Sequence, residues 1–460
     1  MVFSTPIFLF LFLPAVLVLN YIIPKKYIAA KNVVLLIASL FFYAWGEPKN
    51  VLLMLLSIAV NYVCGLLLGR FDSDEKKRKV VLWASVVFNL GLLFFFKYFS
   101  FVTGGLFPVI KLPIGISFFT FQIMSYTIDV YRRSVEPQKS LLKLALYISL
   151  FPQLIAGPIV RYIDVEKQLT YRECTAEKTA RGMIRFSMGL AKKVIVSNTV
   201  AAICDGIFGS TNTVPAFTAW VGVICYALQI YFDFSGYSDM EIGMGHMLGF
   251  DFLENFNYPY VSCSVQEFWR RWHISLSSWF RDYLYIPLGG NRRGKVRTYI
   301  NLIIVFACTG LWHGASFSFI VWGLWHGLFL VIERLGFKKA LDKLPKFIGW
   351  IYTMLVVLVG WVFFRADTLA DAKVILHQMF TWENGIYPAS LFVNRKVIFL
   401  AVLGVLLSGI VQSICPKLRE HLYEKEVTKT VDIVIMAVLL FLCTMYLVSS
   451  TYNPFIYFRF

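Results

Sequence analysis

Hydrophobic runs of membrane-spanning length recur along nearly the whole chain, and they constrain its fold more than any other feature. A transmembrane helix needs about 20 consecutive apolar residues, within a range of roughly 17–25. Runs that reach or approach this length lie at 7–23, 33–46, 51–69, 80–98, 114–131, 186–208, 216–234, 299–312, 317–334, 347–364, 396–414 and 431–450. Because lipid offers no hydrogen bonds to backbone groups, these runs predict an all-α, polytopic membrane protein with roughly 11–12 transmembrane helices.

A further apolar segment, residues 141–159, is interrupted by Pro152, Gly157 and Pro158. Broken backbone at membrane depth is tolerated where protein or a cavity covers it. This segment therefore predicts a re-entrant piece instead of a full span. The hydrophobic runs leave no place where a soluble domain could be separated, so residues 1–460 are expected to form a single membrane domain.

The charged residues are distributed unevenly between the spans. The chain holds 44 Lys and Arg against 27 Asp and Glu, a formal net charge of +17, while 58% of its residues are hydrophobic. Basic residues in short loops mark the cytoplasmic side, and those in 25–31, 70–79, 132–133, 161–193 and 270–297 predict an N-terminus outside the cell. The run 72–79 (DSDEKKRK) predicts a solvated turn, and 365–395 then falls outside. Nucleic-acid binding is not indicated, because the aromatic residues lie inside apolar runs.

Several common kinds of site are missing from the sequence. The eight cysteines show no CxxC spacing, and most lie in or beside apolar runs, so neither a disulfide framework nor a metal site is predicted. The chain also lacks an HExxH motif, a G-x-S-x-G nucleophile elbow and a dinucleotide fingerprint. No tightly bound cofactor is expected.

The stretch 268–314 concentrates the polar chemistry of the chain. His313 ends the apolar run 299–312, and an ionisable group at membrane depth usually faces a cavity or a partner. The pentapeptide GLWHG occurs at 310–314 and again at 323–327, where it carries His326. On one helix thirteen residues would rotate by about 220° and rise by about 20 Å, so we expect only one of the two histidines to react. The other is expected to pack or to gate, and each histidine taken alone is more often a hydrogen-bonded core residue.

A second histidine, His273, lies in the segment EFWRRWHISLSSWFRD. On a helix, Trp269, Trp272 and Trp279 fall partly on one stripe with His273 at its edge. Such a segment predicts an amphipathic helix lying at or just below the membrane interface. The alternative is that the tryptophans only anchor this helix as part of an aromatic belt.

The turn GGNRRGKV at 289–296 is a near match to a phosphate-binding loop. Val296 stands where a magnesium-binding Ser or Thr is required, and no strand is predicted before it, so an NTPase is not indicated. Arg292, Arg293, Lys295 and Arg297 could still hold the phosphates of a nucleotide-bearing donor, or simply anionic lipid head groups.

Two acidic residues, Asp233 and Asp239, lie in YFDFSGYSD near the inner end of a predicted span. They are expected to form salt bridges with nearby arginines or to orient a histidine.

Longer motifs carry a resemblance to a known family. The segments FWRRWHISLSSWFRDYLYIPLGGNR, RTYIN and GLWHGASFSFIVWGLWHG resemble the membrane-bound O-acyltransferase (MBOAT) family, and within it the bacterial alginate O-acetyltransferase branch. Further matching segments follow the same order along the chain: FFYAWGEP, LPIGISFFTFQIMSYTIDVYR, FPQLIAGPIVR, YFDFSGYSDMEIG, NFNYPY, GWVFFRAD and NPFIYFRF. Together they cover nearly the whole sequence.

The resemblance implies a fold in which transmembrane and re-entrant helices surround a central tunnel, with a catalytic region at about 230–335. The family's catalytic histidine lies in a WHG motif, which corresponds to His313. A second functional histidine of the bacterial members lies in RRWH, which corresponds to His273. Trp312, Asp233, Arg281 and Asp282 are expected to support them.

The chemistry implied by the resemblance is acyl transfer from a thioester. His313 is expected to take the proton of an acceptor hydroxyl as it attacks the thioester carbonyl, a role typically worth 10²–10⁴-fold in rate, to order of magnitude. His273 is expected to orient the donor or to stabilise the oxyanion. The cluster Arg292, Arg293 and Lys295 is expected to hold the phosphates of coenzyme A.

The resemblance implies an O-acyltransferase, a multi-pass protein of the bacterial inner membrane, that passes acetyl groups from cytoplasmic acetyl-CoA across the bilayer. The acetyl group would modify an exported or cell-wall polysaccharide, as in alginate biosynthesis, with the help of an extracytoplasmic partner of the SGNH-hydrolase type. Two alternatives remain open. One is D-alanyl transfer to teichoic acid from a carrier-protein thioester, and the other is a non-catalytic transporter of polysaccharide precursors.

Overall fold

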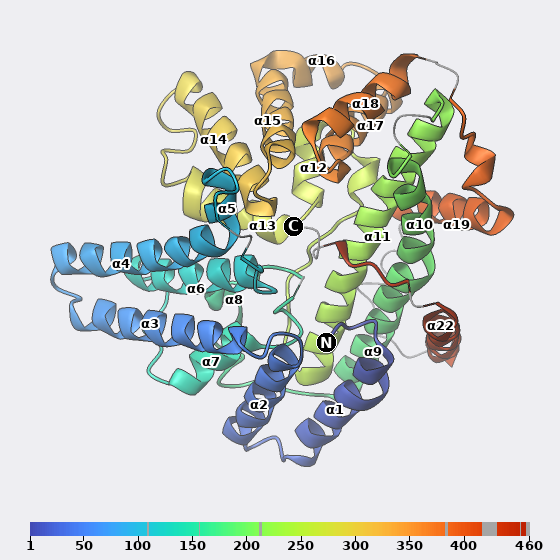
Figure 1. Cartoon of the computed structure of the whole chain (residues 1–460). Helices are drawn as coiled ribbons and strands as arrows, with labels where there is room; N and C mark the ends of the chain where they lie inside the picture. The colour runs from blue at the N-terminus through green and yellow to red at the C-terminus, as the bar shows by residue number, and fades with distance from the viewer. Residues whose placement is uncertain are drawn as a thin grey trace. The chain divides into compact units, whose positions relative to one another are not determined.

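The computed structural model describes residues 1–107, 110–155, 157–210, 214–381, 385–415, 430–450 and 452–456, and these form helices and loops with no β-strand (Figure 1). The described residues group into two compact units. The first comprises Met1–Gly189, Tyr237–Leu253 and Val427–Leu440, and the second comprises Leu190–Gly236, Glu254–Glu426 and Phe441–Phe460. The single membrane domain expected for residues 1–460 stays a prediction.

Eight helices among the described residues are long and apolar enough to cross a membrane, which confirms the all-α, polytopic class. They are α2 (Ile28–Gly46), α3 (Asn50–Arg70), α4 to α5 (Glu75–Val102), α11 (Ala216–Leu248), α15 to α16 (Phe317–Leu341), α17 (Lys346–Arg365), α19 to α20 (Arg395–Ile414) and α22 (Thr430–Ser449). Within three of these spans the helix changes pitch, at η2 (Phe94–Tyr98), η7 (Glu333–Phe337) and η9 (Leu406–Ile410).

The other predicted runs are helical as well, but they are shorter, interrupted or, in the case of α14, less apolar. They form η1 and α1 (Phe8–Phe12, Leu13–Ile22), α6 (Ile116–Tyr131), α9 (Ala176–Ala191) with η3 (Lys192–Ser197) and α10 (Asn198–Phe208), and α14 (Lys295–His313). The segment predicted as re-entrant forms α7 (Leu141–Ser149), after which the backbone turns irregularly before α8 (Tyr162–Val165). The helix thus ends just before Pro152, as the breaker residues predicted.

In the first unit, a buried polar network joins α3, α4 and α6. The Asn61 Oδ1 atom accepts hydrogen bonds from Asn89 Nδ2 at 2.8 Å and from Ser85 Oγ at 2.7 Å. Ser85 Oγ also lies 3.0 Å from Thr127 Oγ1 on α6. In an apolar environment such bonds link helices that have no hydrophobic reason to associate.

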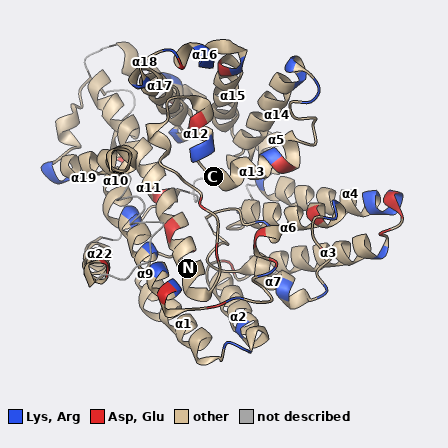
Figure 2. Ribbon diagram, turned by 180° about the vertical axis from the view of Figure 1, so that it is seen from behind, with Lys and Arg blue, Asp and Glu red and all other residues tan. Residues whose placement is uncertain are grey.

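The charge run 72–79 forms the turn between α3 and α4 and the start of α4, where Lys, Arg, Asp and Glu gather in Figure 2. The Asp74 side chain caps α4 by accepting a hydrogen bond from the backbone of Lys77. Arg78 departs from the predicted solvated turn, because it is only 1% exposed. Its guanidinium donates to the Leu68 carbonyl and to carbonyls at the end of α6, where backbone acceptors have no intrahelical partner.

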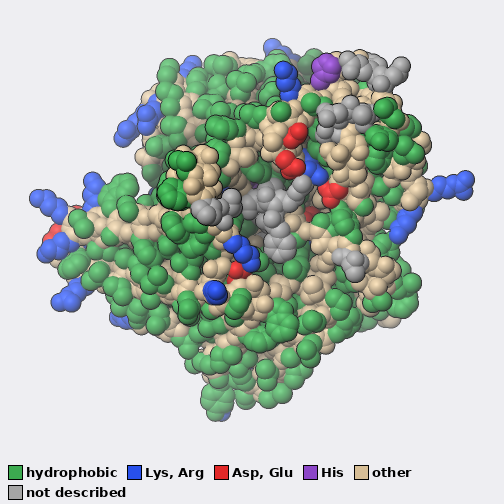
Figure 3. All heavy atoms as spheres, viewed as in Figure 1, with side chains coloured by type: hydrophobic (Ala, Val, Ile, Leu, Met, Phe, Trp, Pro, Cys, Tyr) green, Lys and Arg blue, Asp and Glu red, His purple; other side chains and the backbone are tan. Residues whose placement is uncertain are grey.

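Hydrophobic side chains cover much of the face seen in Figure 3. The helix α22 shows the pattern most clearly, since residues such as Val431, Ile435 and Phe441 are largely exposed. Apolar surface of this extent marks a region that contacts lipid or protein. The exposed faces therefore agree with a chain that is embedded in a bilayer.

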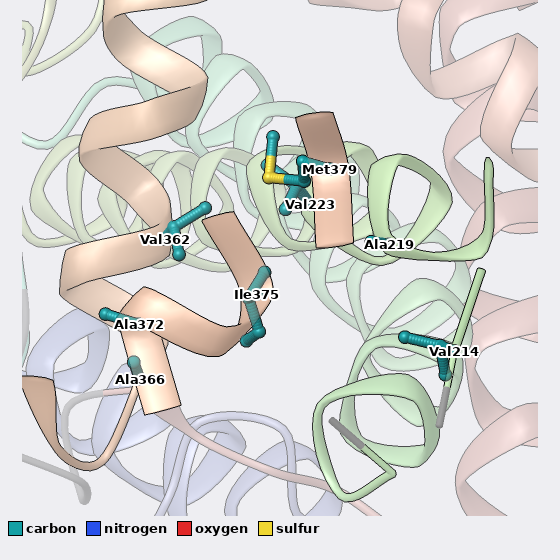
Figure 4. Close-up of a cluster of buried hydrophobic side chains, with 8 residues drawn as sticks. All are labelled: Val214, Ala219, Val223, Val362, Ala366, Ala372, Ile375 and Met379. Carbon is teal, nitrogen blue, oxygen red and sulfur yellow. The ribbon is translucent and has the colours of Figure 1, made fainter. Parts of the chain in front are cut away.

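In the second unit, a hydrophobic cluster joins α11, α17 and α18 (Leu369–Thr381). Figure 4 shows its eight buried side chains, Val214, Ala219, Val223, Val362, Ala366, Ala372, Ile375 and Met379. The Trp220 indole also donates a hydrogen bond of 2.9 Å to the Met379 carbonyl. The cluster fixes the end of α17, which contributes to the site described below.

The two GLWHG copies form the contact between α14 and α15. A Cβ atom added at Gly310 would lie 2.2 Å from the Phe319 carbonyl oxygen, and one added at Gly323 would lie 2.1 Å from that of Phe306. Only glycine permits backbones to approach so closely. The repeated glycines therefore hold the two helices together as a hairpin that turns at Gly314.

Candidate active site

His313 is the last residue of α14, at the place that the apolar run predicted. Its side chain is 5% exposed and packs against three aromatic rings. The ring centroids of Trp312, Trp322 and Phe364 lie 5.0, 5.1 and 5.0 Å from the imidazole centroid. Three helices, α14, α15 and α17, thus position this one histidine.

A small cavity, here called the histidine cavity, opens beside His313 and has a volume of about 10 Å³. It is lined by Ile230, Phe234, Trp272, His313, Trp322, Trp361, Phe364 and Ile456. His313 is the one ionisable residue among these eight. A reacting group that enters this cavity would meet the imidazole in an environment that excludes bulk water.

The backbone breaks at His273, so the continuous amphipathic helix predicted for this segment is wrong. The structure has two short helices, α12 (Val265–Arg271) and α13 (Ile274–Phe280), and His273 between them has a φ of 44° and a ψ of 56°. Two residues of the preceding loop, Asn255 and Asn257, stabilise the break through their backbone groups. Asn257 N–H donates to the Arg271 carbonyl, and the Asn255 carbonyl accepts from Ile274 N–H, both at 2.9 Å.

The tryptophans of this segment do not serve as an aromatic belt. Trp269, Trp272 and Trp279 are 8%, 2% and 5% exposed, so they are core residues of the second unit. Trp272 lines the histidine cavity, and Trp269 packs edge-to-face on Trp322 with 5.7 Å between centroids. The anchoring alternative is therefore wrong.

The Asn255 side chain determines which nitrogen of His273 carries a proton. Its Oδ1 atom accepts from the Ser275 backbone N–H at 3.2 Å and from Ser275 Oγ at 2.9 Å. Because the backbone N–H can only donate, this contact identifies the oxygen end of the amide. His273 Nδ1 lies 3.1 Å from the same oxygen, so Nδ1 is the donor.

His273 therefore presents Nε2 as a lone-pair acceptor. The side chain is 1% exposed, and Nε2 has no hydrogen-bond partner within the described ranges. Burial lowers the pKa of His273 to about 3, which keeps the ring neutral. The ring packs edge-to-face on Phe234 at 4.5 Å.

Trp312 connects the two predicted catalytic histidines. Its ring centroid lies 5.0 Å from that of His313 and 6.1 Å from that of His273. The structure thus brings His313, His273 and Trp312 together in one aromatic cluster. The supporting role expected for Trp312 stays a prediction.

His326 lies on α15, whereas His313 lies on α14. The separation expected for two histidines thirteen residues apart on one helix therefore does not apply. The two histidines pack against the same indole, with His326 at 5.3 Å from Trp322. His326 is fully buried beside Trp269 and stacks over Phe268, and neither ring nitrogen has a hydrogen-bond partner in the described part of the chain. Its contacts are those of a packing residue.

The predicted acidic residues form ion pairs. Asp239 lies 2.6 Å from Arg185 on α9, which confirms the expected pairing with an arginine. Asp233 pairs with a lysine instead, since its Oδ1 atom lies 2.7 Å from Lys193 Nζ. Arg281 and Asp282 pair with each other at 2.7 Å in η6 (Arg281–Tyr285).

The basic turn before α14 is exposed. Arg292, Arg293 and Lys295 all have exposed side chains, as a site for a soluble ligand requires. Lys295 and His313 are the first and last residues of the 19-residue helix α14, so they are separated by about 27 Å along its axis. The structure therefore separates the predicted phosphate site from the predicted reaction site by the length of this helix.

Two larger pockets lie around the end of α17. The Arg365 pocket has a volume of about 590 Å³, and Asp205, Arg365, Asp367 and Ile456 are among its lining residues. A second pocket of about 210 Å³ is lined in part by Ser316, Phe364 and Arg365. Arg365 pairs with Asp205 at 2.6 Å. Through Ile456 and Phe364, both pockets share lining residues with the histidine cavity.

Sequence reasoning missed four residues that build this region: Asn255, Lys193, Phe364 and Ile456. Asn255 lies in NFNYPY, Phe364 in GWVFFRAD and Ile456 in NPFIYFRF, segments that had been noted only for their resemblance. An asparagine followed 18 residues later by a histidine carries no local pattern that predicts their contact. Lys193 had been grouped with the basic residues of a predicted loop, yet its side chain is buried.

Comparisons with known proteins identify the family of the chain. The model of the membrane-bound O-acyltransferase family matches residues 133–369. The probable alginate O-acetylase AlgI of Pseudomonas aeruginosa is 45% identical over 399 residues, which cover 83% of this chain and 76% of that protein. The peptidoglycan O-acetyltransferase of Helicobacter pylori is 35% identical over 100% of this chain and 98% of its own length.

A more distant similarity connects the chain to the teichoic acid D-alanyltransferase of Bacillus subtilis, which is 27% identical over 46% of this chain and 56% of that protein. The family match spans more than half of the chain and includes His273, His313 and His326. The chain is therefore a member of the membrane-bound O-acyltransferase family and an O-acyltransferase.

Proposed function

We propose that this protein passes acetyl groups from cytoplasmic acetyl-CoA across the bacterial inner membrane for the O-acetylation of an exported or cell-wall polysaccharide. The names of the relatives at 45% and 35% identity, an alginate O-acetylase and a peptidoglycan O-acetyltransferase, support an acetyl group and a polysaccharide acceptor. The observation that carries the proposal is His313, the one ionisable residue among those that line an otherwise apolar cavity.

In the proposed reaction His313 acts as the general base. An acceptor hydroxyl attacks the thioester carbonyl, and a neutral ring nitrogen of His313 takes the hydroxyl proton as the new C–O bond forms. The C–S bond then breaks, and the proton passes from the imidazolium to the leaving thiolate. The apolar lining favours this cycle, because it begins and ends with a neutral imidazole.

His273 would position the donor. With Nδ1 donating to Asn255, a neutral His273 has only a lone pair to offer at Nε2. Such an atom suits an amide N–H of the pantetheine arm of coenzyme A, which can donate a hydrogen bond. It does not suit a developing oxyanion, which needs a donor, so of the two roles expected for His273 we favour orientation of the donor.

The exposed basic turn would hold the phosphates of the donor. Arg292 and Arg293 can bind phosphate oxygens through their guanidinium groups, and Lys295 adds a further positive charge. Because this turn and His313 lie at opposite ends of α14, the donor would extend along the helix from its phosphates to its thioester. The basic residues of 270–297 support a cytoplasmic position for this end of α14.

On the opposite side, the Arg365 pocket would admit the acceptor. An extracytoplasmic protein of the SGNH-hydrolase type would receive the acetyl group there, on a hydroxyl of its own or of the polysaccharide, and complete the transfer. The alternative of D-alanyl transfer from a carrier-protein thioester has weaker support, because the D-alanyltransferase relative matches less than half of the chain. The second alternative, a non-catalytic transporter, would show no thioester turnover, so a turnover assay distinguishes it from the proposed enzyme.

The test is thioester turnover by the purified protein in lipid vesicles, with radiolabelled acetyl-CoA, for the wild type and for His313→Ala. The proposal expects label to be released or transferred by the wild type only. Equal turnover by both proteins would contradict the assignment of His313. Turnover with a D-alanyl carrier protein and not with acetyl-CoA would favour the first alternative, and substrate movement that persists in His313→Ala would favour a transporter.

A further inference from the structure

The last described residues of the chain, 452–456 (dark red in Figure 1), return to α11 and meet a buried ion pair. Asp233 Oδ1 lies 2.7 Å from Lys193 Nζ, and each side chain is only 1% exposed. Removing two charges from water is expensive unless further hydrogen bonds satisfy them. The groups that supply those bonds are therefore part of what stabilises the pair.

The C-terminal segment supplies them through its backbone. Ile456 N–H donates to Asp233 Oδ2 at 2.9 Å, and Lys193 Nζ donates to the Pro454 carbonyl. A third contact joins the side chains of Asn198 and Asn453 at 3.1 Å. Both members of the ion pair thus bind the same short segment. Lys193 donates a hydrogen bond to it, and Asp233 accepts one from it.

These bonds place Ile456 between two hollows. Its side chain is 3% exposed, and it lines both the histidine cavity and the Arg365 pocket. The first hollow has a volume of about 10 Å³ and the second of about 590 Å³. An apolar side chain at their shared wall limits what passes from the large pocket to His313.

We propose that Lys193 and Asp233 are positioning residues that clamp the C-terminal segment, so that Ile456 closes the histidine cavity toward the Arg365 pocket. Release of the clamp opens a path for a hydroxyl or for water to reach His313. The proposal rests on the proposed function only in treating the Arg365 pocket as the acceptor side. The closure itself follows from contacts that are independent of the acyl group.

The chain offers a matched control on the same helix. Asp239, six residues after Asp233 on α11, is 3% exposed and pairs with Arg185 at 2.6 Å. Asp239→Asn removes a buried ion pair of the same kind as Asp233→Asn does. It leaves Lys193 and Asp233 in place, so a general loosening of the protein can be told apart from release of the clamp.

The experiment measures access to the histidine cavity without any acyl donor. Ile230, which lines the cavity and is 3% exposed, is replaced by cysteine, and its rate of modification by methanethiosulfonate ethylammonium is followed by site-resolved mass spectrometry. Ile230→Cys is combined in turn with Ile456→Ala, Asp233→Asn and Asp239→Asn. Melting temperatures in detergent confirm that each variant is folded.

The proposal expects Asp233→Asn to accelerate modification by about 10- to 100-fold, the factor by which loss of a charged hydrogen-bond partner shifts an opening equilibrium. Ile456→Ala is also expected to accelerate modification, because it shortens the side chain that closes the cavity. Asp239→Asn is expected to leave the rate unchanged. An unchanged rate in Ile456→Ala, or equal acceleration in Asp239→Asn, would overturn the proposal. If Asp233→Asn does not fold, Ile456→Ala still decides the outcome. Since no acetyl-CoA is present, failure of the turnover test leaves this result intact.

Discussion

His313 and His273 are both buried in the second unit, yet the chain holds them in different ways. His313 ends a regular helix and is held by aromatic rings from α14, α15 and α17. His273 interrupts a helix and is held by a hydrogen bond from its Nδ1 to Asn255. The Asn255 hydrogen bond also determines which nitrogen of His273 carries the proton. A proton fixed at Nδ1 suits a group that orients the donor through Nε2.

The backbone at His273 supports this distinction. A non-glycine residue in the left-handed region carries a strain of about 1–3 kcal/mol, which persists only where the surroundings stabilise it. At His273 the φ is 44°, and Asn255 provides both a backbone and a side-chain contact at the break. We infer that this strain serves to direct Nε2.

The largest effect is expected from replacing each histidine by glutamine. His313→Gln should lower kcat by about 10²–10⁴-fold, because it removes a general base. His273→Gln should mainly raise the KM for acetyl-CoA, by about tenfold, because it removes one hydrogen bond to the donor. Initial-rate kinetics in proteoliposomes separate the two effects. A larger loss of kcat in His273→Gln than in His313→Gln would reverse the assigned roles.

The next effect concerns Asn255. Asn255→Ala leaves the His273 Nδ1–H, the Ser275 N–H and the Ser275 hydroxyl without their buried acceptor, at a cost of about 1–3 kcal/mol for each group. The melting temperature and the affinity for acetyl-CoA should both fall. Asn255→Asp keeps an acceptor oxygen and should restore most of the affinity. If the two variants bind the donor equally, the tautomer of His273 is irrelevant to binding.

The third prediction concerns the dependence of folding stability on pH. Burial lowers the pKa of His273 to about 3 from its ordinary value of 6.5. As the pH falls, His273 is therefore protonated in the unfolded chain before it is protonated in the folded protein. The stabilising contribution of the neutral ring is complete above pH 6.5 and is lost progressively as the pH falls toward 3. By pH 5 the loss amounts to about 2 kcal/mol. Melting curves between pH 7 and 5 should therefore be flatter for His273→Gln, and identical slopes would contradict the buried neutral ring.

The smallest effect is expected at the basic turn. Arg292→Ala should raise the KM for acetyl-CoA by about 2- to 5-fold at low salt and less at high salt, because an exposed charge pair is worth up to about 1 kcal/mol and is screened. The matched control is Lys339→Ala, which removes an exposed charge from α16. An equal change in both variants would show that net charge, and not this turn, determines the effect.

The parts of the site that follow from local pattern could be predicted from the sequence. The apolar run 299–312 placed His313 at a helix end, and the hydrophobic runs predicted the all-α membrane class, because spanning a bilayer requires a contiguous stretch of suitable residues. The GLWHG repeat was recognised as a pattern. Its physical role, close packing of α14 on α15 through glycines, became clear only from the contacts.

The remaining parts depend on residues that are distant in sequence. Helical periodicity predicted an uninterrupted helix through His273, because the groups that stabilise the break belong to Asn255 and Asn257. Lys193 was assigned to a basic loop by its neighbours, although its partner Asp233 lies 40 residues away and buries it. The C-terminal segment was noted as a matching motif without any indication that it returns to this pair.

The most direct test is a structure of the protein bound to acetonyl-CoA, a non-hydrolysable analogue in which a methylene group separates the sulfur from the carbonyl. The analogue is expected to extend along α14, with its phosphates at Arg292 and Arg293. Its ketone carbon is expected in the histidine cavity beside His313, and an amide N–H of its pantetheine arm is expected within hydrogen-bond distance of His273 Nε2. An analogue bound with its ketone away from His313, or with no contact to His273, would contradict the assignment of a base and a positioning residue.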